Sequence, residues 1–122
     1  MNILVDISVW IDHLRTGNRV LLQVLMAARV ITHEGIIGEL ALGNLTRRDS
    51  FLHSLQGLPL AVPASHREVM LLISANRLQG RGVGHPDVHL LASARLTSDA
   101  RLWTHDKRPA AVAEELDIAF RP

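Results

Sequence analysis

The chain has 122 residues, of which 48% are hydrophobic and 20% charged, and its formal net charge at pH 7 is +1. This length suits one ordinary domain over residues 1–122, and the apolar content excludes wholesale disorder. The absence of cysteine excludes disulfides, zinc–thiolate sites and cysteine nucleophiles.

The first half of the chain is predicted to alternate strands with helices. A buried strand is expected over residues 2–6, followed by a helix over 8–15 that is capped near Asp6 or Ser8. The next expected elements are a helix over 18–29, a short strand over 30–33, a helix over 35–48 and a short helix over 50–56. The helix over 18–29 is apolar around most of its circumference, which leaves apolar surface for a partner.

The second half continues the alternation. Its expected elements are a strand over 58–62, a helix over 65–79, a glycine-rich turn over 80–87, a helix over 86–96, a strand over 101–104, a helix over 108–116 and a closing strand over 118–120. Ser65 and Glu68 have the spacing of a capping box at the start of the first of these helices.

This order of elements predicts an α/β fold. The expected strands are apolar throughout, which is typical of a mostly parallel sheet of four or five strands covered on both faces. Ligands bind such sheets beyond the carboxyl ends of the strands. No apolar run reaches the roughly 20 residues of a membrane span and no signal peptide is recognised, so a cytoplasmic protein without a membrane partner is expected.

Several acidic side chains are expected near the carboxyl ends of the strands, where ligands bind in such folds. Asp6 and Asp106 each follow an apolar strand, Asp87 begins a helix after the glycine-rich turn, and Glu39 lies within an apolar helical stretch. Carboxylates gathered in one cleft repel each other unless a cation compensates them. A set of oxygen ligands without cysteine favours Mg²⁺ or Mn²⁺, ions that support phosphodiester cleavage.

Each acid also has a purely structural interpretation. Asp6 and Asp87 are well placed to cap helices, Asp106 to begin one, and Glu39 to lie on a solvent-facing stripe. The spacing alone therefore leaves two alternatives open: a non-catalytic α/β binding module, and another metal phosphohydrolase with an acidic site. Stabilisation by Mg²⁺ or Mn²⁺ would separate an acidic metal site from simple helix capping.

Four segments taken together resemble the PIN-domain ribonuclease toxins of VapBC toxin–antitoxin modules. They are "LVDISVWIDHLR" at 4–15, "GIIGELALG" at 35–43, "HPDVHLLASARL" at 85–96 and "DARLWTHDKR" at 99–108. The resemblance implies a single PIN-like domain with a three-layer α/β/α sandwich and an endoribonuclease that depends on Mg²⁺ or Mn²⁺. It further implies a homodimer, a cognate VapB-like antitoxin, and a transfer RNA or ribosomal RNA substrate.

The resemblance also assigns site residues. The acidic site of the family, both catalytic and metal-binding, corresponds to Asp6, Glu39, Asp87 and Asp106. Ser8 and Thr104 correspond to hydroxyl residues that support it. Two departures stand out: Ile7 replaces a usual hydroxyl residue after the first aspartate, and His85 with Pro86 replaces apolar residues before the third acid.

Several other polar residues near these motifs have no assigned role. His85 and His89 are four residues apart, a spacing that can bind zinc, although no HExxH motif is present and rim or structural histidines are the preferred interpretation. His105 is expected to face solvent and Asp99 to lie in a turn. Asp12 is expected to pair with Arg15 or Arg19 on the surface.

Overall fold

The computed structural model describes residues 1–122, and it has an α/β architecture built on a parallel sheet. Its strands are β1 (Asn2–Val5), β2 (Val30–Ile31) and β3 (Ala100–Trp103). Its helices are α1 (Ile7–Thr16), α2 (Arg19–Met26), α3 (Glu34–Leu42), α4 (Arg48–Gln56), α5 (His66–Ala75), α6 (His85–Leu96) and α7 (Lys107–Glu115). None of these helices combines the length and apolar character that crossing a bilayer requires.

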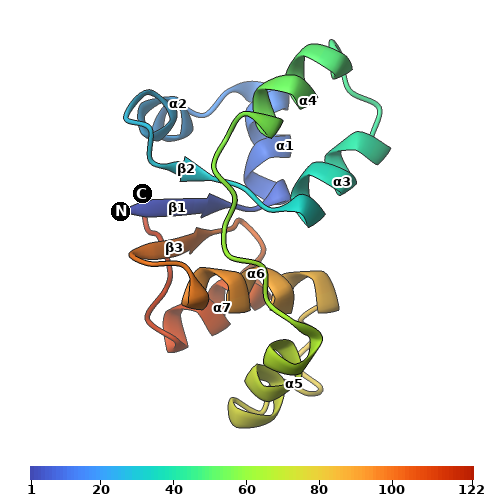
Figure 1. Cartoon of the computed structure of the whole chain (residues 1–122). Coiled ribbons are helices and arrows are strands. Elements are labelled where there is room, and N and C mark those ends of the chain that lie inside the picture. Colours follow the sequence, from blue (N-terminus) through green and yellow to red (C-terminus); the bar gives the residue numbers. More distant parts are fainter.

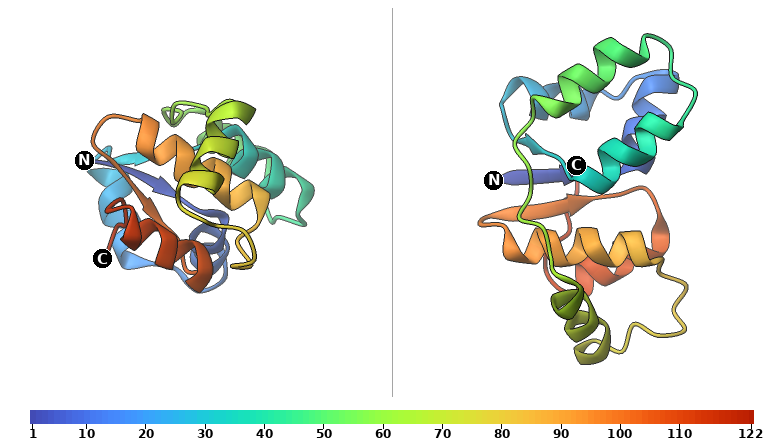
Figure 2. Two further views of the ribbon diagram at one scale, coloured as in Figure 1. Left: turned by 90° about the horizontal axis from the view of Figure 1, so that it is seen from below. Right: turned by 45° about the vertical axis from the view of Figure 1, so that its right-hand side comes forward.

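The strand order is β2-β1-β3, with β1 in the centre and both neighbours parallel to it. The strands run through the middle of the molecule, with α1 to α4 on one side and α5 to α7 on the other (Figure 1). Turned views show α6 and α7 near β3, and α5 farther out (Figure 2). Because all three strands run the same way, their carboxyl ends meet at one edge of the sheet.

The expected strands over 58–62 and 118–120 do not form as strands. Leu60 makes one parallel bridge with Thr32, beside β2, and Ala119 makes one with Leu102, in β3. Pro59 and Pro63 flank the first bridge and lack the amide hydrogen that a longer ladder needs. The expected four or five strands are therefore three strands, with a single bridge on either side.

Three helices end at least three residues earlier than predicted, and two of these ends lie just before a residue with left-handed backbone. The helix expected over 18–29 stops at Met26, and Ala28 has a φ of 56°. The helix expected over 65–79 stops at Ala75, two residues before Arg77 with a φ of 51°. The helix expected over 35–48 ends at Leu42, next to Gly43.

The core is aliphatic, as the shortage of aromatic residues predicts. Ile3, Leu4 and Val5 of β1 are fully buried. Helix α6 packs beside β3 and buries six residues: Val88, Leu90, Leu91, Ala92, Ser93 and Ala94. Both tryptophans are buried and belong to this core. Trp10 of α1 packs edge-on against Phe51 of α4, whereas Trp103, the last residue of β3, packs against Phe120.

Candidate active site

Each of the three strands is followed by a polar residue that caps the next helix. Asp6 caps α1, His33 caps α3 and Asp106 caps α7, in each case with a side-chain atom that accepts a hydrogen bond from a backbone amide two residues later. Parallel strands place all three caps at the same edge of the sheet. The capping interpretation is thus correct for Asp6 and Asp106, and the same geometry gathers them at the edge where ligands bind.

Asp6 is the most buried acid in the chain, with 4% of its surface exposed. Its Oδ2 atom accepts hydrogen bonds from the Ser8 hydroxyl at 2.6 Å, the Thr104 hydroxyl at 2.9 Å and the Ser8 amide at 3.3 Å. Because all of these bonds fall on Oδ2, the other carboxylate oxygen is left for a ligand. These hydrogen bonds hold the buried carboxylate of Asp6 in one orientation.

Ser8 and Thr104 also connect Asp6 to the turn after β3. The Ser8 hydroxyl accepts a hydrogen bond from the His105 amide at 3.0 Å, and the Thr104 hydroxyl accepts one from the Asp106 amide at 3.1 Å. Each hydroxyl therefore donates to Asp6 and accepts from the turn that carries Asp106. These bonds fix the position of Asp6 relative to that turn, across 98 residues of sequence.

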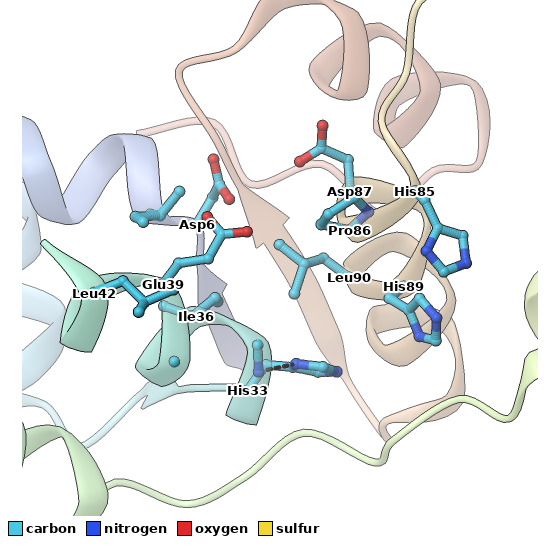
Figure 3. Close-up of a pocket in the computed structure, with 13 residues that line it drawn as sticks. Asp6, His33, Ile36, Glu39, Leu42, His85, Pro86, Asp87, His89 and Leu90 are labelled. Carbon is cyan, nitrogen blue, oxygen red and sulfur yellow. Dashed lines mark hydrogen bonds between the residues drawn. The ribbon is translucent and has the colours of Figure 1, made fainter.

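Asp6, Glu39 and Asp87 line the same cavity, which has a volume of about 750 Å³. Their carboxylates extend into it from the end of β1, from α3 and from the first turn of α6 (Figure 3). Its remaining walls include apolar side chains of α3 and α6, and no lysine or arginine lines it. No permanently charged lysine or arginine within the lining therefore neutralises the three carboxylates.

Asp106 is not among the residues that line this cavity. Its exposed side chain turns back to accept a hydrogen bond at 3.2 Å from the Arg108 amide at the start of α7. It nevertheless lies near enough to Asp87 for its charge to act on that group. The structure thus brings Asp6, Glu39 and Asp87 together and leaves Asp106 beside them.

Asp87 shows the electrostatic consequence of this crowding. Burial is the largest cause that raises the pKa of its carboxyl, which reaches about 6 from an ordinary 3.8. Neighbouring negative charges raise it further, in the order Asp6, Asp106 and Glu39. A carboxyl group that is partly buried beside other negative charges is stabilised by binding either a proton or a cation.

The raised pKa of Asp87 predicts an unusual dependence of stability on pH in ion-free buffer. Between about pH 4 and pH 6 the folded protein keeps a proton that the unfolded chain has lost, so the stability due to this group falls as pH rises through about 6. Asp87→Asn should remove that loss. Urea unfolding of both proteins at pH 5 and pH 7 measures it: the stability of the variant relative to the wild type should increase with pH. A relative stability that is constant or decreasing would contradict the assigned pKa.

The cavity carboxylates suit a hard divalent ion in their chemistry. The donors are all oxygen atoms, Asp6 has an oxygen without a protein partner, and no lysine or arginine of the lining competes for the site. As the side chains are placed, no three acids, histidines or cysteines surround one point closely enough to coordinate an ion. Binding would therefore require side-chain rotation, which the exposed Glu39 and partly exposed Asp87 allow.

Histidines form a part of the site that the sequence analysis did not assign. His33, His85 and His89 all line the cavity. His33 comes two residues after the end of β2, whereas Asp6 directly follows β1, and the rule about strand ends would have found His33 if applied to residues other than acids. His105 is exposed, yet its ring contacts Asp12, so the expected pairing of Asp12 with Arg15 or Arg19 is wrong. Asp99 lies in the turn before β3 and pairs with the amino group of Met1 at 3.0 Å.

Two known proteins are similar to nearly the whole chain. Both are named Ribonuclease VapC32, one from Mycobacterium tuberculosis strain CDC 1551 / Oshkosh and the other from strain ATCC 25618 / H37Rv. Each is 44% identical to this chain over 118 residues, which cover 97% of this chain and 95% of the relative. No family model matches the chain.

Proposed function

The chain belongs to the VapC family of PIN-domain ribonuclease toxins, and we propose that its endoribonuclease activity requires Mg²⁺ or Mn²⁺ held by the cavity carboxylates. The observation that carries this proposal is the crowding of Asp87 by burial and by three other acids, with no lysine or arginine in the cavity lining. A divalent ion is the simplest compensation for such a site. This membership favours catalysis over a silent binding module.

In this proposal the four acids have different roles. Asp6 and Asp87 hold the ion, Asp106 contributes directly or through water, and Glu39 either contributes a ligand or orients the attacking water. When bound, the ion supplies Lewis acidity toward water and the phosphate oxygens. Water oxygen attacks phosphorus while the bond to the 3′ oxygen breaks, so the products carry a 5′-phosphate and a 3′-hydroxyl. Ser8 and Thr104 act by keeping Asp6 in place.

The proposed substrate is structured RNA, either transfer RNA or ribosomal RNA. Total cellular RNA incubated with the purified chain and Mn²⁺ should be cut at a small number of positions whose downstream fragments begin with a 5′-phosphate. Mapping the fragment ends by ligation with and without prior phosphorylation tests both points. Fragments ending in 2′,3′-cyclic phosphate, or equal cleavage in the presence of a chelator, would contradict the mechanism.

Ion binding should also stabilise the fold. If the carboxylates form the site, saturating Mn²⁺ should raise the melting temperature by about 5 °C or more, because binding to the folded state alone adds to its stability. The double variant Asp6→Asn, Asp87→Asn should lose that rise. Differential scanning fluorimetry across a Mn²⁺ titration measures it, and an equal rise in the double variant would place the ion elsewhere.

We further propose a VapB-like antitoxin as partner, a homodimer as the assembly and the cytoplasm as the location. Exposed apolar side chains on the α1–α4 side of the strands support the need for partners: Leu22 is 50% exposed, Met26 is 88% exposed and Leu42 is 90% exposed. Leu22 and Met26 lie one turn apart on α2, so together they expose apolar surface of the kind found at protein interfaces. Light scattering of the purified chain tests the dimer, and co-purification with the product of the neighbouring reading frame tests the antitoxin.

A further inference from the structure

Four of the seven histidines gather at one side of the cavity, away from the cap residues of α1 and α7. His33, His85 and His89 line it, and His66 at the start of α5 is close enough for its charge to affect His89. Figure 3 shows the rings of His85 and His89 next to one another on α6, beside Asp87. The carboxylate mechanism assigns no role to this group.

The rings of His85 and His89 lie next to each other on α6. His85 and His89 are separated by one helical turn, so their side chains share one face of the helix. Their ring centroids are 4.7 Å apart and the rings are nearly perpendicular. The rings of His13, His33 and His105 take part in hydrogen bonds, whereas none involves those of His85 and His89. Their nitrogen lone pairs are therefore free to bind a ligand.

We propose that His85 and His89 together bind one divalent transition-metal ion such as Zn²⁺ on the wall of the cavity. Two histidines at this spacing on a helix are the zinc-binding arrangement of HExxH helices. Imidazole prefers zinc, copper and nickel, whereas magnesium prefers the oxygen ligands of Asp6, Glu39 and Asp87. The cavity would then hold two chemically distinct cation sites.

Water completes the coordination of this ion. No three acids, histidines or cysteines are close enough together to form a full protein ligand set. An exposed site with two protein ligands is expected to have a dissociation constant of about 10–100 µM, far weaker than a structural zinc site. The ion is thus a reversible ligand of the folded chain, and the fold does not depend on it.

The test is a calorimetric titration of the full chain, without a histidine tag, with ZnCl₂ in excess Mg²⁺. The wild type should bind one Zn²⁺ per chain, and His85→Gln and His89→Gln should each weaken binding at least tenfold. His53→Gln, which alters an exposed histidine on α4, is the matched control and should bind as the wild type does. Circular dichroism verifies that each variant is folded.

Unchanged Zn²⁺ affinity in His85→Gln and His89→Gln would overturn the proposal, as would equal weakening in the His53→Gln control. Electron paramagnetic resonance of bound Cu²⁺ gives a second readout. It should show coupling to two imidazole nitrogens in the wild type and to one in each cavity variant, and a spectrum with oxygen ligands alone would also overturn the proposal. Neither experiment involves RNA, so their outcome is separate from that of the proposed function.

Discussion

Asp6→Asn should reduce RNA cleavage by roughly a thousandfold or more while the chain remains folded. The amide oxygen of asparagine can accept the same hydrogen bonds from Ser8 and Thr104 that Oδ2 accepts. Its NH₂ group then occupies the place of the remaining carboxylate oxygen, where it repels a cation. The substitution therefore removes the ligand and keeps the local structure.

The measurement is the initial rate of cleavage of one mapped RNA site in Mn²⁺, with the variant and wild type purified identically. Asp49→Asn is the matched control because it changes an exposed aspartate in the first turn of α4 and should cleave at the wild-type rate. Circular dichroism should show the same helix content in all three proteins. Cleavage by Asp6→Asn within a few fold of the wild type would remove Asp6 from the active site.

Leu4→Ala should have the largest effect on stability, a loss of about 2–5 kcal/mol in the free energy of unfolding. Leu4 is fully buried in the central strand, in register with Ile31 of β2 and Leu102 of β3. Truncation leaves a cavity between both neighbours, which the flanking strands cannot fill without losing their hydrogen bonds. Such a loss is a large fraction of the stability of an ordinary domain.

Urea denaturation measured by circular dichroism tests this expectation. Leu22→Ala is the control of the same chemistry on α2, where the leucine is 50% exposed, and it should cost less than about 1 kcal/mol. A cost for Leu4→Ala no greater than that of the control would show that β1 is not packed as described.

The position of Asp6 could be predicted from the sequence because it depends only on the strand that directly precedes it. An apolar strand that runs directly into an acid places the acid at the strand end, whatever the strand order. The residue pattern also selected Asp87 and Glu39 as candidates but left capping and solvent-facing interpretations open, since neither follows a strand directly and only tertiary packing brings α3 and α6 to the same cavity. The structure places these three residues in the lining of one cavity, and their catalytic and metal-binding roles stay a prediction.

The remaining differences arise from effects that residue patterns do not express. Asp106 is two residues beyond Thr104, far enough for its side chain to turn away and cap α7. The strands predicted at Leu60 and Ala119 are single bridges in the structure. Apolar side chains suggest a strand, but strand pairing also depends on backbone hydrogen bonds. The contact between Asp12 and His105 joins residues 93 positions apart, so local charge spacing favoured nearby arginines instead.

The positions of the two indoles give this enzyme a built-in optical probe. With no tyrosine in the chain, ultraviolet emission comes from Trp10 and Trp103 alone. One belongs to the helix that Asp6 caps, and the other ends β3, next to Thr104 and 6.1 Å from the ring of His105. Occupancy of the carboxylate cavity should therefore change the native fluorescence without any attached dye, and mutating each tryptophan singly would assign the signal to one side of the site.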